Sequence, residues 1–159
     1  MSDERYLVTE KGHAQLLKQL KHILLVERPK NVQDIEEARA HGDLSENAEY
    51  HAAKERQGLL DAEKRLIEDR LGRAQKVDPT KLSGDKVVFG GTVTLCNSDT
   101  EEEVVYQLVG EHEADLKEGR INYRSPLARG MMGKEIGDEF DFKAPGGTRT
   151  YEIVDIEFV

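Results

Sequence analysis

The chain has 159 residues, which is room for one domain or two small ones. Its 32 acidic and 23 basic residues leave a formal charge of −9, and this acidic balance argues against a protein that binds bare DNA through contacts with the DNA phosphates. A single cysteine, Cys96, excludes an intrachain disulfide and a cysteine-cluster zinc site, and no apolar run approaches the roughly 18 residues of a membrane span. We therefore expect a soluble, cytoplasmic protein with no membrane partner, in which Cys96 is a small buried residue of a strand.

Two long helical patterns make up the first half of the chain. In the first, Thr9 is a plausible N-cap, and Leu16, Leu20 and Ile23 recur at helical spacing. Pro29 lacks a backbone N–H group and should kink this helix. The apolar period then resumes at Val32, Ile35 and Ala38.

The second helical pattern is a heptad seam that advances by alternating steps of three and four residues. Its members are Tyr50, Ala53, Gln57, Leu60, Lys64, Ile67, Leu71 and Ala74. A short turn around Gly42 joins the two patterns, and two helices of similar length joined in this way predict an antiparallel hairpin. At 1.5 Å per residue, about thirty residues give an arm of roughly 45 Å.

The period changes from helical to alternating after residues 78–84, so we place a domain boundary between residues 80 and 81. Strands are predicted at 87–89, 92–95, 104–109, 139–142 and 151–158. Pro126 marks the start of a short helix over 127–132. The predicted fold class is α+β: a helical hairpin over 1–80, followed over 81–159 by a small antiparallel sheet with one short helix.

Asp43 and Glu46 lie three residues apart at the predicted tip of the hairpin. If the second helix began here, the two side chains would share one face, with Cβ atoms about 5–6 Å apart. Such a pair could bind one Mg²⁺, but the ion takes about six oxygens, so a partner would have to supply the remainder. The alternative is structural, because Asp is a favoured N-cap and Glu three residues later completes a capping box. The spacing fits both interpretations.

The chain resembles the bacterial transcript cleavage factors of the GreA/GreB family in motifs spread over nearly its whole length. They are the segments 37–39, 42–50, 88–90 with 92–93, 125–130 and 133–134. Residues 52–57 are more similar to the GreA branch than to the more basic GreB branch. The resemblance implies an N-terminal coiled-coil hairpin and a C-terminal domain with an FKBP-like fold.

The resemblance also implies a function. The hairpin of this family enters the secondary channel of RNA polymerase, where the tip acids reach the catalytic Mg²⁺ and stimulate cleavage of backtracked nascent RNA. On this chain Asp43 and Glu46 would be the catalytic acids and would bind the shared Mg²⁺, so that the protein donates ligands and is not itself an enzyme. A basic patch formed by Arg39, Lys54 and Arg56 would contact the 3′ segment of the RNA. The segment with Ser125, Pro126 and Arg129 would dock on the rim of the polymerase channel. We expect a monomer.

Other interpretations of the same residues stay open. An anti-cleavage or channel-blocking paralogue would use the same arm without productive metal chemistry, and the implied FKBP-like fold suggests a peptidyl-prolyl isomerase, although fold alone confers no activity. A coiled-coil adaptor would place no demand on the tip. His41 and His51 suggest a transition-metal site but lack a clear third ligand. The basic patch could be solvated surface, and Pro126 could simply begin a helix.

Overall fold

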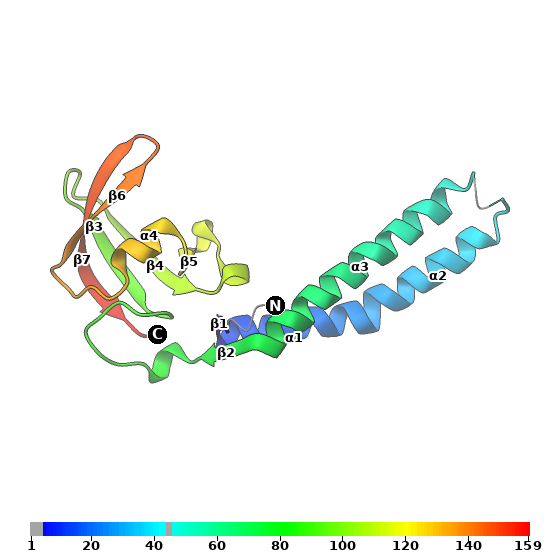
Figure 1. Ribbon diagram of the computed structural model, residues 1–159, viewed down its shortest axis with the longest axis horizontal. Coiled ribbons are helices and arrows are strands. Elements are labelled where there is room, and N and C mark those ends of the chain that lie inside the picture. Colours follow the sequence, from blue (N-terminus) through cyan, green and yellow to red (C-terminus); the bar gives the residue numbers. More distant parts are fainter. Residues whose placement is uncertain (1–4, 44–45) are drawn as a thin grey trace. The chain divides into compact units, whose positions relative to one another are not determined.

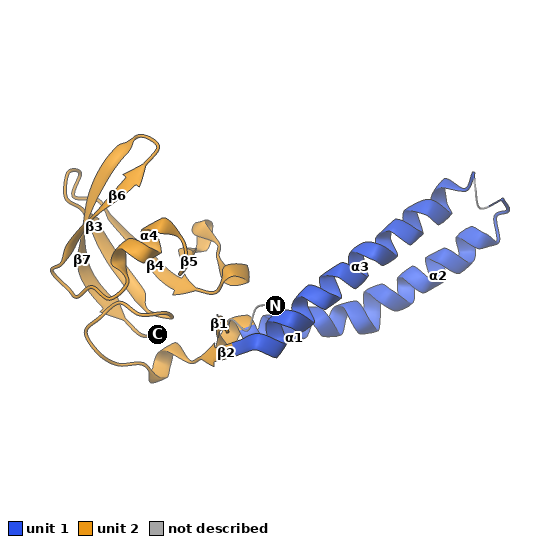
Figure 2. Ribbon diagram, viewed as in Figure 1, with its two compact units in different colours: residues 1–4, 13–74 blue, residues 5–12, 75–159 orange. Residues whose placement is uncertain are grey.

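The computed structural model describes residues 5–43 and 46–159. These residues form two compact units (Figure 1, Figure 2). The first unit contains residues 13–43 and 46–74, and the second contains residues 5–12 and 75–159. The fold class predicted from the sequence is confirmed, with a helical hairpin followed by a small sheet domain.

The first unit is built on a hairpin of two helical arms. The first arm runs without a break through α1 (Glu10–His22), a π-helical turn η1 (Ile23–Glu27) and α2 (Arg28–Arg39), and the second arm is α3 (Ala48–Arg73). The predicted N-cap of the first arm is confirmed, because the N–H of Gly12 donates to Thr9 Oγ1 at 3.1 Å.

The two arms pack along the predicted seam. On α3 the buried residues are Ala53, Leu60 and Ile67, which recur every seven positions. The seam residues between them, including Gln57 and Lys64, are partly buried. This pattern is typical of a narrow coiled-coil contact in which most of each helix surface faces water.

The first arm departs from the expected period next to its proline. Asn31 is buried where the sequence pattern predicts Val32, and the Val32 side chain is 50% exposed. The cause is the π-helical turn: the N–H of Arg28 bonds to the carbonyl of Ile23, five residues back, so the helix is locally wider and the buried face shifts by one residue. Pro29, which has no N–H to donate, lies in the first turn after this bulge.

The second unit contains a five-stranded sheet with the strand order β5-β4-β3-β7-β6. Its strands are β3 (Thr92–Asn97), β4 (Glu103–Val109), β5 (Arg120–Asn122), β6 (Glu139–Ala144) and β7 (Gly147–Glu157). Neighbouring strands are antiparallel except for β5, which pairs parallel with β4 at the edge. A two-stranded sheet pairs β1 (Tyr6–Thr9) with β2 (Ala74–Val77).

Some strand predictions need correction. Residues 87–89 form no strand; only Lys86 makes an isolated bridge, to Glu135, and the chain then turns at Gly90, whose φ is +89°. The strands β1, β2 and β5 were not predicted, because each has only three or four residues and shows no clear alternation. The four longer strands of the five-stranded sheet agree with the sequence pattern.

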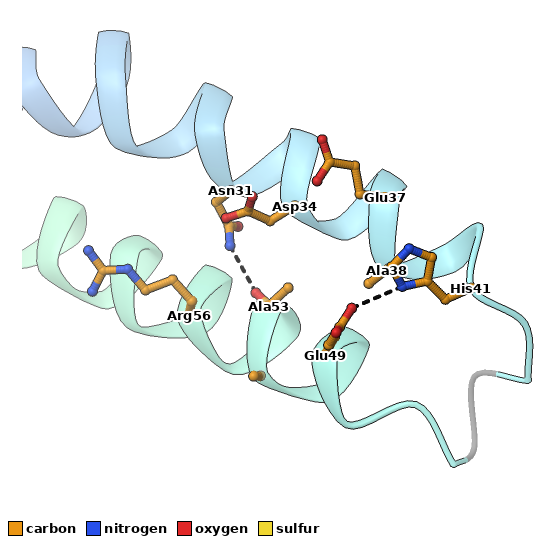
Figure 3. Close-up of a pocket in the computed structure, with 9 residues that line it drawn as sticks. Asn31, Asp34, Glu37, Ala38, His41, Glu49, Ala53 and Arg56 are labelled. Atoms are coloured by element: carbon orange, nitrogen blue, oxygen red, sulfur yellow. Dashed lines mark hydrogen bonds and ion pairs between the residues drawn. The ribbon is translucent and has the colours of Figure 1, made fainter.

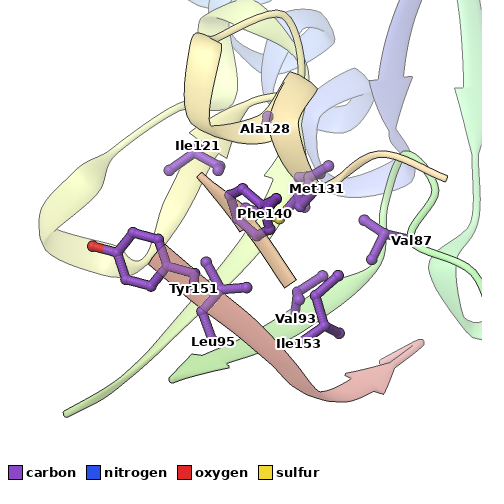
Figure 4. Packing of buried hydrophobic residues seen from close by; sticks show 10 residues of the cluster. Val87, Val93, Leu95, Ile121, Ala128, Met131, Phe140, Tyr151 and Ile153 are labelled. Atoms are coloured by element: carbon purple, nitrogen blue, oxygen red, sulfur yellow. The ribbon is translucent and has the colours of Figure 1, made fainter. Parts of the chain in front are cut away.

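The core of the second unit lies between the sheet and α4 (Pro126–Met131) (Figure 4). Val93, Leu95 and Ile153 from the central strands are fully buried, as are Ala128 and Met131 from α4. The predicted short helix is confirmed, and Ser125 is its N-cap, with Pro126 in the first turn. Among the described helices, none combines the length and apolarity needed to cross a membrane.

Glu113 is a buried carboxylate held by backbone groups from two segments of the second unit. Its Oε2 accepts hydrogen bonds from the N–H groups of Thr9 (3.1 Å) and Gly110 (2.9 Å), and its Oε1 accepts one from the Thr9 hydroxyl. Beside it, His112 Nε2 lies 3.1 Å from the carbonyl oxygen of Gly12. These contacts fasten the end of β1 and the start of α1 to the loop that follows β4.

Candidate functional site at the tip of the hairpin

The loop between the two arms carries the acids singled out from the sequence. Helix α2 ends at Arg39 and α3 begins at Ala48, so Asp43 and Glu46 lie outside both helices. Both side chains are exposed. Residues 44 and 45 of the same motif lie outside the described residues.

The structure tests whether Asp43 and Glu46 cap the second helix. The N-cap of α3 is Asn47, whose Oδ1 accepts a hydrogen bond from the N–H of Tyr50 at 3.1 Å. The alternative in which Asp43 and Glu46 form a capping box is therefore wrong, because the helix begins after both of them. The argument that helical spacing would place them on one face fails for the same reason.

The two acids nevertheless share one surface feature. A hollow of about 440 Å³ is lined by His41, Asp43, Glu46, Asn47, Ala48 and Glu49. Carboxylate oxygens of the kind that Mg²⁺ prefers are thus gathered at the end of the arm. His41 Nδ1 lies 3.0 Å from Glu49 Oε2, a contact that joins the end of α2 to the start of α3 (Figure 3).

A groove between the arms continues toward the base of the hairpin (Figure 3). It has a volume of about 400 Å³, and its charged lining includes Asp34, Glu37 and Arg56. Within residues 5–43 and 46–159, no group of three or more His, Cys, Asp or Glu side chains could hold a metal ion. The transition-metal hypothesis for His41 and His51 therefore has no third ligand among the described residues.

The predicted basic patch consists of exposed side chains on both arms. The Arg39 guanidinium lies 5.9 Å from the centre of the Tyr50 ring. Lys54 Nζ donates to Gln57 Oε1 at 2.8 Å, and Arg56 forms an ion pair with Glu27 at 2.9 Å. Exposed pairs of this kind are worth about 0–1 kcal/mol, so an incoming phosphate can replace the partner at little cost.

The predicted docking residues lie at the start of α4 in the second unit. Ser125 Oγ accepts a hydrogen bond from the N–H of Ala128 at 3.4 Å, which gives it a structural role as N-cap. Pro126 and Arg129 are exposed. Ser125 thus sets the start of a helical turn on which the other two side chains reach solvent.

Cys96 lies in β3 as expected, but it is only partly buried. It pairs across the sheet with Glu103 on β4 and with Glu152 on β7. Partial burial, followed by the negative charges of Glu103, Glu152 and Glu101, raises the pKa of the Cys96 thiol.

We therefore expect Cys96 to react with iodoacetamide several-fold more slowly than an ordinary thiol at about pH 8, because the thiolate is the nucleophile. The pH dependence of the alkylation rate should be displaced to higher pH. The double variant Glu103→Gln, Glu152→Gln should react faster than the wild type, whereas Glu111→Gln, which removes a charge elsewhere, should not. A wild-type profile with the midpoint of an ordinary thiol would contradict the expectation.

Comparison with known proteins finds similarity over nearly the whole chain. Residues 6–75 match the family model described as "Transcription elongation factor, N-terminal", and residues 82–158 match "Transcription elongation factor, GreA/GreB, C-term". The chain is 53% identical over 156 residues to the transcription elongation factor GreA of Phenylobacterium zucineum, covering 98% of this chain and 99% of the relative. The identity to GreA of Caulobacter vibrioides is also 53%, with the same coverage. Among solved structures, the GreA factor homolog 1 of Thermus thermophilus aligns with a TM-score of 0.43 and 25% identity, covering 97% of this chain and 99% of that one.

Proposed function

Because the chain belongs to the GreA/GreB family of transcription elongation factors, we propose that it binds RNA polymerase and stimulates cleavage of backtracked nascent RNA. In this proposal the helical hairpin enters the secondary channel of the polymerase with its tip first. Hydrolysis takes place in the active site of the polymerase, so the chain acts as a protein cofactor and not as an independent nuclease.

The observation that carries the proposal is the position of the tip acids relative to α3. Asp43 and Glu46 precede the helix, and Asn47 is its N-cap. Neither carboxylate is the N-cap of α3, so each can be substituted without removing that cap. Two exposed carboxylates lining one hollow are suited to binding a cation.

The chemistry of these side chains fits Mg²⁺ that is shared with a partner. Carboxylate oxygens are hard ligands, but two of them leave most of an octahedral shell to be filled from elsewhere. We place the missing ligands on the polymerase and on the RNA phosphate. When bound, such an ion would stabilise charge on the oxygens that change bonding during phosphodiester hydrolysis. The contribution of this chain is to carry two anionic oxygen donors to that position.

We further propose that Arg39, Lys54 and Arg56 contact the phosphates of the displaced RNA 3′ segment. All three are exposed, and the first lies in the last turn of α2, beside the tip. Contacts of this kind position a nucleic acid without reading its sequence. We assign docking on the rim of the channel to the α4 segment with Ser125, Pro126 and Arg129. In this proposal the chain acts as a monomer.

A cleavage assay on a stalled complex tests the proposal. A bacterial RNA polymerase is halted and backtracked on a defined template with 5′-labelled RNA, and shortening of the transcript is followed with and without the full-length chain. We expect faster cleavage with the chain present in Mg²⁺, and intact RNA when the polymerase is left out. Inhibition of intrinsic cleavage would favour the anti-cleavage paralogue, and hydrolysis without polymerase would overturn the cofactor role.

A further inference from the structure

The side chain of Asn47 bonds to both helices at the base of the tip loop. Its Nδ2 donates to the carbonyl oxygen of Ala38 in the last turn of α2, at 2.5 Å. Its Oδ1 accepts from the N–H of Tyr50 in the first turn of α3, at 3.1 Å. Asparagine offers a donor and an acceptor on one short planar group, so a single residue can make both contacts.

Other contacts cross the base of the loop, but they are more exposed. The side chains of the His41–Glu49 pair are 61% and 72% exposed, and exposed pairs of this kind stabilise little. Asn47 is partly buried, and its partner Ala38 is 2% exposed. The amide of Asn47 is therefore the better shielded connection between the ends of the two arms.

Asn47 is also next to the proposed metal-binding acids. Glu46 directly precedes it, and both residues line the hollow that contains Asp43. The extended backbone of Asn47 (φ −90°, ψ 97°) sets the direction in which the chain leaves α3 toward the loop. The bond to Ala38 then fixes this starting point against the other arm.

We infer that Asn47 is a positioning residue: its two hydrogen bonds fix the start of α3, which directly follows Glu46, against the end of α2, so that Asp43 and Glu46 can bind one cation together. The inference rests on the proposed function and adds to it. Losing the bond from Asn47 to Ala38 would cost part of the preorganisation of the two carboxylates without removing either of them. The effect should therefore appear in the Mg²⁺ concentration that stimulated cleavage requires, and much less in the maximal rate.

The test uses Asn47→Ser in the full-length chain. Serine is also a favoured N-cap, so α3 should still begin at the same place, but its side chain is too short to reach Ala38. We expect the Mg²⁺ concentration for half-maximal stimulated cleavage to rise about three- to ten-fold, with binding to the polymerase unchanged. Should Asn47→Ser melt below the assay temperature, Asn47→Thr, which caps in the same way, replaces it.

Asn31 supplies a matched control. Its Nδ2 donates to the carbonyl of Ala53 at 2.9 Å, so it makes the same kind of amide-to-carbonyl bond between α2 and α3, away from the tip. Asn31→Ser should lower the melting temperature at least as much as Asn47→Ser does and leave the Mg²⁺ requirement unchanged. The inference is overturned if Asn47→Ser has the wild-type Mg²⁺ requirement, or if both variants shift it equally. A wild-type chain that binds polymerase but stimulates no cleavage would instead contradict the proposed function itself.

Discussion

Asp43→Asn should reduce stimulated RNA cleavage by about 10²-fold or more, the scale expected when one charge-stabilising group is lost from a reaction centre. The amide keeps the size and polarity of the side chain but removes the anionic oxygen that binds a cation. Because the helix N-cap is Asn47 and not Asp43, the melting temperature should stay close to that of the wild type. Glu46→Gln should behave in the same way. The readout is the rate of transcript shortening in a backtracked complex, together with thermal unfolding by circular dichroism.

Glu36→Gln is the control for charge. Glu36 is an exposed acid of α2, one turn before the end of the arm and outside the hollow at the tip. The Glu36→Gln variant should stimulate cleavage as strongly as the wild type does. This result would separate a specific role of the tip acids from the general charge of the arm. Full activity in Asp43→Asn and Glu46→Gln would remove both residues from the proposed mechanism. Unfolding of either variant at the assay temperature would show that the acid stabilises the hairpin, and the loss of cleavage would then say nothing for a role in metal binding.

Glu113→Ala should lower the free energy of unfolding of the second unit by about 2–5 kcal/mol. The buried N–H groups of Thr9 and Gly110 would both lose their acceptor, and each unsatisfied buried donor costs about 1–3 kcal/mol. Glu113→Gln keeps one carbonyl oxygen as an acceptor and should cost less. The measurement is urea denaturation followed by circular dichroism.

Glu111 provides the comparison, because it lies in the same 3₁₀ turn (η3, Glu111–Glu113) but is exposed. Glu111→Ala should change stability by no more than about 0.5 kcal/mol. Equal stabilities of the Glu111 and Glu113 alanine variants would show that the buried carboxylate contributes nothing to this unit.

Gly12→Ala should also destabilise this unit in urea denaturation, since a Cβ atom at this position would lie 2.2 Å from the Glu113 carboxyl carbon.

Local periodicity was enough to predict most of the architecture. The heptad spacing of Ala53, Leu60 and Ile67 predicts which face of α3 is buried, because apolar packing along the seam of two helices repeats with the helical period. The alternating segments of the longer strands predict the sheet for the same reason. The sequence also placed Asp43 and Glu46 at the turn between the two helices, although its argument from their helical spacing was wrong.

What the sequence left open depends on groups far apart along the chain. The sequence pattern offered Asp43 as the N-cap of the second helix, but α3 begins after Asn47, whose side chain also bonds to Ala38, nine residues back on the other arm. Asn31 replaces Val32 in the seam because a π-helical turn shifts the buried face, and Asn31 then finds its acceptor at Ala53 on α3. Glu113 looks like one of many surface acids until Thr9, more than one hundred residues away in sequence, donates to it. A hydrogen bond of this kind has no period, so only the tertiary structure decides where it forms.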